Sequence, residues 1–504
     1  MTVRPRHLLL ALFLQAALLE ACSPTAQEGG GIGGTGIVAS VTSGPITDFG
    51  SVYVSGEKYD TTGTVFTVDR STGATELDLK RGMVVRVEAS LEVDTVTGQV
   101  LRRMADRITY EDSVEGPLQS VDPTGKSLTV MGQTILLTDT TILDDNIPGG
   151  SLQQLVPHVD ILEVSGFVSG DGVLIASLIQ RKTGAPDYEV KGQARQLDPV
   201  AGTFRIGTLT IEYGAATLQQ LPPTTSPSEW EGLPVHVIGS QLTAETGPSG
   251  SGRLRAVSVA PEVLGVQERR RAEIEGFISQ QLSPTAFLVG SVQIQVDAQT
   301  EFEGGTAADL GPGVRVEVEG FLSGNVLQAT RIELNDRVKL EGDVASAPTG
   351  DSTTGTFSLR ALNGTVVQVT PQTIFRGVGA PTHLGDIVTG DHVVVRGEPS
   401  GTHVIATEIS RQPASPKAVL LGPILANNAP TLTILGTQVD TSPLSESAFR
   451  KADDTIIGRA AFFNAAPPGA IVELEGTSDG LSIQWNEAEL QEYGAPTPHS
   501  RHRH

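Results

Sequence analysis

Apolar and polar residues alternate along most of this chain, in short segments separated by glycine, proline and asparagine. Residues 314–319 read Val-Arg-Val-Glu-Val-Glu, and residues 292–296 read Val-Gln-Ile-Gln-Val. A period of two residues is expected of a strand with one buried face. Asn363-Gly364, between two such segments, is typical of a hairpin turn. The pattern predicts an all-β protein without long helices, with one helical turn near Asp309 and another at 384–386.

The order of these segments repeats along the chain. Openings that end in glycine recur at 114–116, 190–192, 274–276, 340–342 and 420–422, and a first copy opens near residue 36. We count about six copies of roughly 65 to 85 residues, a length at which each copy can close its own core. Five or six short strands per copy fit a small antiparallel β-barrel and resemble an OB-type barrel. The predicted fold is a tandem array of such barrels.

The predicted organisation places these copies between two terminal segments. It consists of a signal peptide at 1–21, a Gly-rich linker at 22–36, barrel repeats at 37–112, 113–185, 186–266, 270–336, 337–413 and 414–493, and a disordered tail at 494–504. Barrel closure removes strand edges through which neighbouring copies would otherwise join. We therefore expect separate barrels arranged as a string.

The start of the chain is typical of a bacterial export signal. Arg4 and Arg6 precede an apolar run at 8–19, and residues 19–21 then lead to Cys22. A basic start, a short apolar core and a small-residue cleavage site in this order define a signal peptide. A helix that spans a membrane needs about 20 apolar residues, so this run is too short to be one.

Cys22 is the chain's single cysteine, so no internal disulfide can form. Leucine three places before Cys22 and alanine directly before it resemble the lipobox of bacterial lipoproteins. This resemblance implies that Cys22 is lipidated and becomes the mature N-terminus. Ser23 stands where aspartate would resemble an inner-membrane retention signal. We expect an outer-membrane lipoprotein that faces the periplasm or the cell surface.

The charge of the chain excludes one class of partner. The formal net charge is −23 at pH 7. Nucleic acid and anionic lipid headgroups would be repelled by such a chain, so we expect neither as a partner. The predicted contact with a membrane is the lipid anchor alone.

No segment carries the signature of a particular reaction. His383, His392 and His403 fall in one copy and could approach each other to bind a metal, but they lack the close spacing of a ligand cluster. His236 lies in a strand-like segment, where a partly exposed strand histidine is the simpler interpretation, and His158 has no partner motif. We expect no catalytic residue, no metal site and no cofactor.

Two acidic pairs, Asp144-Asp145 and Asp453-Asp454, lie between strand-like segments. They lack the alternating spacing of a calcium loop, so we interpret them as solvated loop charge. Carboxylates that meet only in the fold leave glycoside hydrolysis open from sequence alone. A site on one barrel would not explain six copies, however, and we expect a protein that is not an enzyme.

Three segments carry a family resemblance. Residues 30–36 read Gly-Gly-Ile-Gly-Gly-Thr-Gly, residues 50–56 read Gly-Ser-Val-Tyr-Val-Ser-Gly, and residues 316–320 read Val-Glu-Val-Glu-Gly. They resemble a bacterial family of repeated domains of unknown function found in predicted lipoproteins, most clearly in the first copy and between 270 and 413. The resemblance implies location and architecture, and it brings no activity or site residues.

Two functions fit these observations. The first is a lipid-tethered scaffold or adaptor for an unidentified envelope protein, since repeated copies multiply weak contacts. The second is a module that binds a polysaccharide or another envelope polymer, which usually needs exposed aromatic rings. The rings available for such a surface are few, namely Trp230, Trp485, Tyr53, Tyr59 and Tyr110. We predict that they form no exposed row on any copy.

Overall fold

The computed structural model describes residues 35–96, 99–122, 127–169, 173–184, 188–243, 252–334, 337–371, 373–451 and 455–491. Cys22, the predicted signal peptide and the predicted tail lie outside these residues. The model is 59% strand and 7% helix, which confirms the all-β prediction. Strand β1 (Thr35–Asp48) takes in the last two residues of the predicted linker, because both pair with β6 (Val84–Asp94). No helix in the described part of the chain is long and apolar enough to span a membrane.

The second group of strands shows the plan of each barrel. It contains β8 (Val114–Asp122), β9 (Ser127–Val130), β10 (Gln133–Leu143), β11 (Ile161–Val168) and β12 (Leu174–Lys182). Strand β8 pairs antiparallel with β9 and β11, β9 with β10, and β11 with β12. Strand β10 runs parallel to β12. The order closes as 1-2-3-5-4-1, which is that of an OB-type barrel.

The predicted OB-like barrels are antiparallel except at this closing pair, which runs parallel. A parallel pair needs a crossover connection, and here the chain crosses through η2 (Pro148–Gly150), η3 (Leu152–Gln154) and β11 before it returns. Each of the six strand groups contains such a parallel pair with its last strand. We call the groups barrels 1 to 6 in chain order.

In the three barrels nearest the N-terminus, the helices are single turns of three or four residues. Barrel 1 contains β1, β2 (Val52–Val54), β3 (Glu57–Tyr59), β4 (Val65–Val68), β5 (Ser71–Ala74), η1 (Glu76–Asp78), β6 and β7 (Val100–Tyr110). Barrel 2 contains β8 to β12. Barrel 3 contains β13 (Glu189–Gln193), β14 (Arg195–Asp198), β15 (Thr203–Ile206), β16 (Leu209–Glu212), β17 (Thr217–Leu218), α1 (Pro227–Trp230), β18 (Pro234–Thr243) and β19 (Arg253–Pro261).

The remaining three barrels follow the same plan. Barrel 4 contains β20 (Val266–Ser283), β21 (Ala286–Val289), β22 (Val292–Gln295), β23 (Glu301–Glu303), η4 (Ala307–Asp309), β24 (Arg315–Gly324) and β25 (Val326–Leu334). Barrel 5 contains β26 (Val338–Asp343), β27 (Thr349–Gly350), β28 (Gly355–Phe357), β29 (Val366–Val369), β30 (Ile374–Gly377), η5 (Leu384–Asp386), β31 (His392–Ser400) and β32 (His403–Gln412). Barrel 6 contains β33 (Lys417–Asn428), β34 (Thr431–Ile434), β35 (Thr437–Asp440), η6 (Glu446–Ala448), β36 (Phe449–Lys451), α2 (Gly458–Ala465), β37 (Ile471–Ser478) and β38 (Ile483–Leu490).

Barrels join in pairs through their first strands. Strand β1 pairs parallel with β20, β8 pairs antiparallel with β13, and β26 pairs antiparallel with β33. The expectation that barrel closure leaves no edge for joining is therefore wrong. Strand β2 pairs with β1 at Ile46 and Asp48, so the edge of β1 at residues 40–43 is left for β20. Barrel 1 thus shares a sheet with barrel 4 instead of with its neighbour in sequence.

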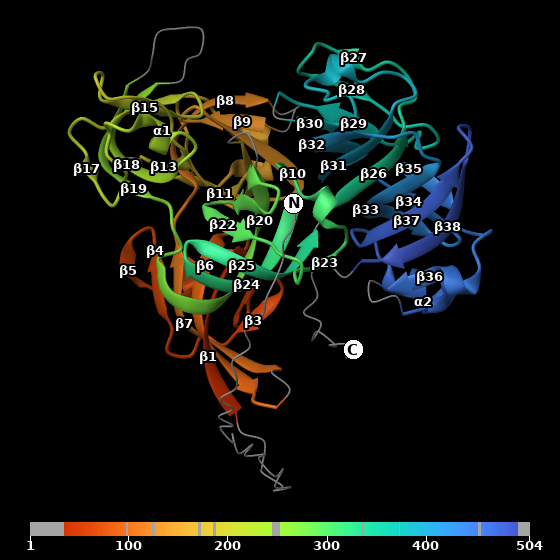
Figure 1. Cartoon of the computed structure of the whole chain (residues 1–504), viewed down its shortest axis with the longest axis horizontal. Helices are drawn as coiled ribbons and strands as arrows, with labels where there is room; N and C mark the ends of the chain where they lie inside the picture. The colour runs from red at the N-terminus through yellow and green to blue at the C-terminus, as the bar shows by residue number, and fades with distance from the viewer. Residues whose placement is uncertain are drawn as a thin grey trace, which may run out of the picture.

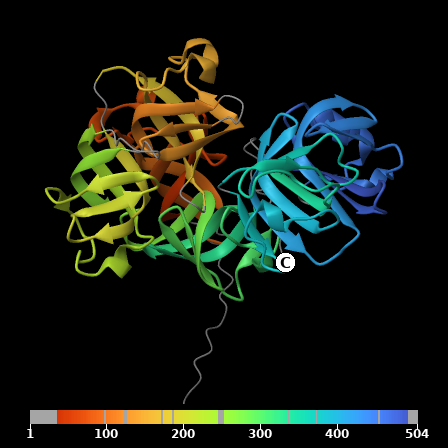
Figure 2. The same ribbon diagram turned by 90° about the horizontal axis from the view of Figure 1, so that it is seen from above.

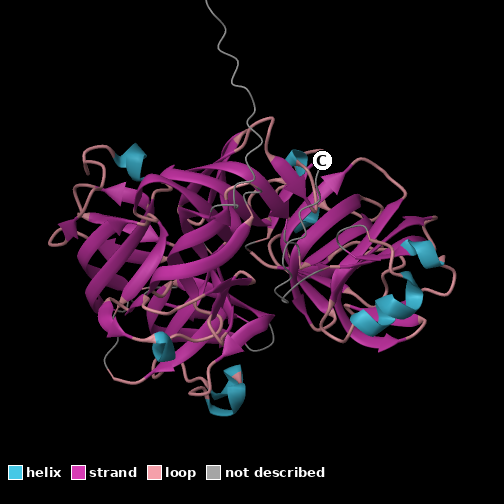
Figure 3. Cartoon of the chain, turned by 90° about the horizontal axis from the view of Figure 1, so that it is seen from below, coloured by secondary structure: helices cyan, strands magenta, loops and turns pink. Residues whose placement is uncertain are grey.

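Barrels 1 to 4 gather into one body, and barrels 5 and 6 lie beside it (Figures 1 and 2). Barrel 1 contacts barrel 2 where Ser177 Oγ donates a hydrogen bond of 2.5 Å to the Gly82 carbonyl. Barrel 3 approaches barrel 4 where Gly232 lies next to Gln280. Together with the two shared sheets, these contacts close a ring of four barrels. The few helices lie mainly at the outside of the molecule (Figure 3).

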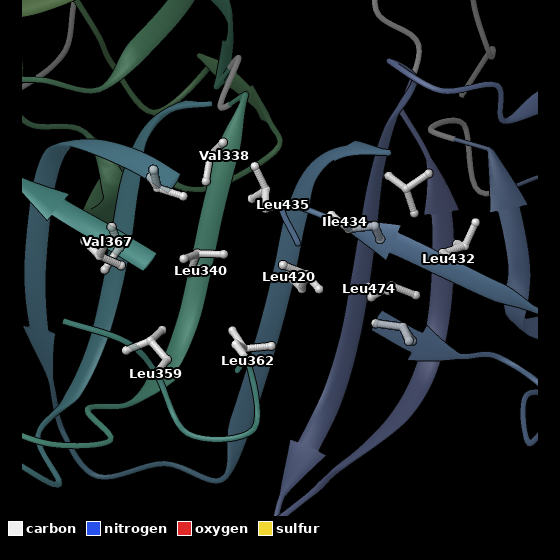
Figure 4. Packing of buried hydrophobic residues seen from close by; sticks show 14 of the residues in the cluster. Val338, Leu340, Leu359, Leu362, Val367, Leu420, Leu432, Ile434, Leu435 and Leu474 are labelled. Atoms are coloured by element: carbon white, nitrogen blue, oxygen red, sulfur yellow. The ribbon is translucent and has the colours of Figure 1, made fainter. Parts of the chain in front are cut away.

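The cores are mainly aliphatic, and two of them extend through a pair of barrels. Barrels 5 and 6 share one buried cluster that includes Val338 and Leu340 on β26 and Leu420 on β33 (Figure 4). Barrels 2 and 3 share another cluster, which surrounds the buried ring of Trp230. Each joined strand carries inward side chains at alternate positions, so the strands that link two barrels also fill their cores.

Candidate binding cavity

A cavity of about 370 Å³ lies where barrels 1 to 4 meet. Barrel 1 supplies Val84, Val85 and Arg86 of β6 to its wall, and the segment after β7 supplies Glu111. The other walls come from Phe167 of barrel 2, Lys191, Gln193, His236 and Glu262 of barrel 3 and its exit, and Ile274, Glu275, Phe277, Val289 and Ser291 of barrel 4. No single barrel could form this cavity alone.

Charged and polar side chains form the wall on the side of barrel 3. Lys191 on β13 stands directly opposite His236 on β18, so both side chains leave the same face of the sheet. Lys191 Nζ lies 3.4 Å from Glu111 Oε2 and 3.5 Å from Glu262 Oε1. His236 Nε2 lies 2.7 Å from Glu189 Oε1. Each charge on this wall therefore has a partner of opposite sign.

The field at this wall favours a charged lysine. Burial alone would lower the pKa of Lys191, but the carboxylates of Glu262 and Glu111 outweigh burial and raise that pKa above its usual value. Burial would likewise raise the pKa of Glu189, but the hydrogen bond from His236 and the charge of Arg70 lower it below its usual value. Lys191 and Glu189 are therefore both charged at neutral pH.

Aromatic and aliphatic side chains form the opposite wall. Phe167 on β11 and Phe277 on β20 pack edge to face, with ring centroids 6.2 Å apart. The guanidinium of Arg315 lies 5.5 Å from the Phe167 centroid, and its Nη2 is 2.6 Å from Glu275. Gly276, beside Phe277, allows β20 to approach both Val289 and Phe167. A Cβ at this position would lie 2.9 Å from the Val289 side chain and 3.7 Å from the Phe167 ring. The cavity is thus polar on one side and apolar on the other.

A buried acidic cluster lies behind the polar wall, between barrels 1, 2 and 3. Lys182 Nζ contacts Glu163 and lies 3.7 Å from both Asp69 and Glu115. Burial and the charge of Glu163 raise the pKa of Asp69 to about 7, against the opposing effect of Lys182 and with smaller contributions from Glu189 and Glu115. Ionisation of Asp69 is therefore disfavoured in this cluster.

Asp112 belongs to the same cluster and is 2% exposed. Burial raises its pKa well above the usual value, and the charges of Glu189 and Glu163 add to that effect. Its Oδ1 is buried and has no hydrogen-bond partner among the described residues. A neutral carboxyl at Asp112 is the state that this surrounding favours.

Comparison with known protein families gives one match. The family model described as Domain of unknown function (DUF5666) matches residues 115–180, 275–333 and 341–410. Barrels 2, 4 and 5 carry DUF5666 domains. No curated protein matches this chain. The three DUF5666 segments agree with the predicted resemblance to repeated domains of unknown function.

The histidines in the DUF5666 segment of barrel 5 do not form a cluster. His392 begins β31 and His403 begins β32, which places them at opposite ends of that hairpin. His392 instead contacts Asp343 at 3.0 Å and Glu341 at 3.4 Å. His383 precedes η5 and lies 3.4 Å from Asp386. No group of three potential metal ligands occurs among the described residues.

The aromatic rings are mostly internal. Trp230, Tyr59 and Tyr110 are buried, and Trp485 packs partly against the core of barrels 5 and 6. Tyr53 is half-buried beneath Lys58, outside the DUF5666 segments. Within the described part of the chain, Phe321 is the one aromatic side chain classed as exposed, and the Arg269 guanidinium covers its ring.

Asp144 corrects the interpretation of the first acidic pair as solvated charge. Its carboxylate accepts a hydrogen bond of 2.8 Å from Lys80 Nζ, which links barrel 1 to the DUF5666 segment of barrel 2. Asp145 is exposed, and Asp453-Asp454 lie outside the described residues. The correction has a plain cause, since sequence does not indicate that barrel 1 packs against this loop.

Lys191 and the polar wall were not predicted, and His236 was interpreted as an ordinary strand histidine. The alternating pattern gives the face on which each side chain lies, but it does not give the neighbour of that face. His236 does lie on a strand, as predicted, and the structure adds that it lines a cavity to which four barrels contribute. Only an indication of contact between distant barrels would have singled it out.

Proposed function

We propose that this chain is a non-enzymatic scaffold of the cell envelope, tethered by lipid on Cys22, that presents fixed surfaces to a partner protein. The observation that carries the proposal is the joining of barrels through shared strands. Repeated barrel-like domains of unknown function fit such a role. In a flexible string the barrels would change position relative to one another. Here the first strands of two barrels pair in one sheet, so the faces that the barrels present stay at fixed distances.

Ion pairs between barrels 4 and 5 support the same proposal. The largely buried Arg315 of barrel 4 lies 3.5 Å from the buried Glu398 of barrel 5, and the buried Arg396 of barrel 5 lies 3.2 Å from the half-buried Asp309 of barrel 4. Arg376 Nη2 donates a hydrogen bond of 2.9 Å to the Asp309 carbonyl. Charges removed from water tolerate little displacement, because separation leaves them unpaired. The joint between barrels 4 and 5 is therefore specific in its geometry.

The anchor part of the proposal rests on the sequence around Cys22. Thirteen positions separate Cys22 from Thr35, where β1 begins (35 − 22). An extended chain of that length spans at most about 45 Å. In this proposal, lipid on Cys22 keeps barrel 1 within that distance of the membrane.

The anchor is tested by metabolic labelling with a palmitate analogue. We expect label on the native chain and none on Cys22→Ala, with Ser23→Ala as the matched neighbour control that keeps its label. Label that persists on Cys22→Ala would contradict the proposed anchor. This experiment addresses location and leaves the scaffold role to the next one.

The scaffold role is tested by crosslinking in intact envelopes, followed by purification of the chain. We expect one specific protein to be crosslinked to the native chain and to be lost with Cys22→Ala. Recovery of glycan alone would contradict the scaffold and favour the polymer-binding alternative. The burial of Trp230, Tyr59 and Tyr110 gives that alternative little support, because sugar-binding surfaces use exposed rings.

A further inference from the structure

The cavity lined by barrels 1 to 4 is not explained by a scaffold role. It is a recess open to solvent, and its volume of about 370 Å³ falls in the range of pockets that hold small molecules. Charged, polar and apolar side chains from four barrels converge on it. Its walls are therefore a candidate binding site.

The hydrogen bonds of Lys191 on the polar wall are long. Its Nζ lies 3.4 Å from both the carbonyl oxygen and Oε2 of Glu111 and 3.5 Å from Glu262 Oε1, beyond the usual length of an N–H···O bond. These three acceptors match the three donors of an ammonium group, but none is at close range. A ligand oxygen placed beside Lys191 could accept a shorter bond than either glutamate now receives. The same oxygen could donate to Glu111 if it carried a proton.

The pairing of charges selects against ionic ligands. Lys191 is matched by Glu111 and Glu262, Glu275 by Arg315, and His236 by Glu189. Arg86 Nη2 lies 3.4 Å from Glu88, and its Nη1 donates to the Leu264 carbonyl at 3.0 Å. An anion or a cation that entered the cavity would lose its hydration, and the side chains of opposite charge there are already paired with other residues. A neutral head group avoids this cost.

The opposite wall suits an apolar body. Phe167 on β11 and Val84 on β6 line the space and are half-buried, and burial of such surface contributes roughly 25 cal/mol per Å². Phe277 packs against Phe167. Ile274, Val289 and Val85 lie behind this wall in the cores of barrels 4 and 1. A ligand with one hydrogen-bonding end and one apolar end matches both walls at once.

We propose that the cavity lined by barrels 1 to 4 binds a small uncharged amphipathic molecule, with a hydroxyl group beside Lys191 and Glu111 and an apolar body against Phe167 and Val84. A hydroxyl is the simplest neutral group that both accepts from an ammonium and donates to a carboxylate. The site exists only when all four barrels are assembled, so a ligand would also hold the ring together.

The test uses three probes that share one apolar body, namely octan-1-ol, octanoate and octylamine. Calorimetric titration is carried out on the chain from residue 23 onward, which keeps every described residue and avoids lipid and detergent. We expect saturable binding of octan-1-ol, with an affinity at least ten times higher than that of either ionic probe. No saturable binding of octan-1-ol, or equal affinity for octanoate, would overturn the proposal.

A matched pair of variants locates the site. Ser291 lines the cavity between β21 and β22, and Ser291→Trp is expected to weaken binding of octan-1-ol at least tenfold by filling the space. Ser323→Trp places the same ring at an exposed position on β24 of the same barrel and should change the affinity less than twofold. Equal binding by a folded Ser291→Trp chain would contradict the assignment. The comparison of head groups needs no variant and stands even if Ser291→Trp does not fold.

Discussion

Two glycines occupy equivalent turns of barrels 1 and 4, and each turn presses against the last strand of the next barrel. Gly82 has φ +89° and Gly313 has φ +86°. A Cβ at Gly82 would lie 2.8 Å from the Ser177 carbonyl oxygen, and one at Gly313 would lie 3.0 Å from that of Thr407. Left-handed backbone and close approach both require glycine here. These residues set how near two barrels can come.

Replacement of Gly82 by alanine tests this role. We expect Gly82→Ala to lower the free energy of unfolding by about 2 to 4 kcal/mol, because backbone strain adds to a clash with rigid backbone. Gly63→Ala is the control, since Gly63 has φ +83° but no atom within 4 Å of its added Cβ. Gly63→Ala should cost about 1 to 2 kcal/mol, the strain alone. Urea unfolding measures both, and equal losses would show that the barrel contact is unimportant.

Asp69 makes stability depend on pH in an uncommon direction. Burial and the charge of Glu163 raise its pKa to about 7, so it binds a proton on folding. An aspartate in the unfolded chain has a pKa near 4. The contribution of Asp69 to stability is therefore fully present below about pH 4 and is lost as pH rises towards 7. Above pH 7 the charge on the half-buried Asp69 lowers the free energy of unfolding by a constant amount.

The variant Asp69→Asn keeps the neutral form at every pH. We expect its thermal unfolding midpoint to exceed that of the native chain at pH 8 by a few degrees and to match it at pH 4, measured by calorimetry. Asp145→Asn makes the same substitution at an exposed carboxylate of barrel 2 and should follow the native chain at both pH values. A midpoint difference that is the same at both pH values would contradict the assignment to Asp69.

At the scale of elements, the joint between barrels 4 and 5 depends on strands β31 and β32. Arg396 on β31 lies 3.2 Å from Asp309 across the joint and 3.6 Å from Glu408 on β32, a fully buried residue that Arg376 also contacts at 2.9 Å. We expect Arg396→Met to lower the free energy of unfolding by about 1 to 3 kcal/mol, because both carboxylates lose a cation while Glu408 keeps Arg376. Lys417→Met breaks a more exposed ion pair with Glu475 and should cost less than about 1 kcal/mol. Denaturant titration of both variants checks this, and similar losses would count against the joint.

Sequence predicted the elements better than their partners. The alternation at 314–319 predicted β24, and the helical turns predicted near Asp309 and at 384–386 are η4 and η5. These are local features, set by side-chain period and by residues such as Thr306, which caps η4. The pairing of β1 with β20 joins segments more than 200 residues apart, and no local pattern specifies it. The parallel closing pairs escaped prediction for the same reason.

At the scale of the whole molecule, the expected string of barrels is a ring of four with two more attached. The cavity follows from this ring, and so do the surroundings of Lys191 and His236. The all-β class and the repetition could be read from the sequence because every copy repeats the same short pattern. The candidate site could not be, because its walls come from residues as far apart as Val84 and Ser291. Similar repeats do not indicate which of them will meet.

The shared strand β20 leads to a prediction about fragments. A fragment of residues 35–263 contains barrels 1 to 3 but lacks β20, so the β1 edge at 40–43 and the ring of Phe167, which packs against Phe277, become exposed. Exposed strand edges pair with other chains, and we expect this fragment to self-associate. A fragment of residues 35–334 restores barrel 4 and should remain monomeric under the same conditions. Sedimentation velocity distinguishes the two. A monomeric fragment 35–263 that is folded would mean that β1 does not need β20 to protect its edge, and that barrels 1 and 4 are held together mainly by other contacts.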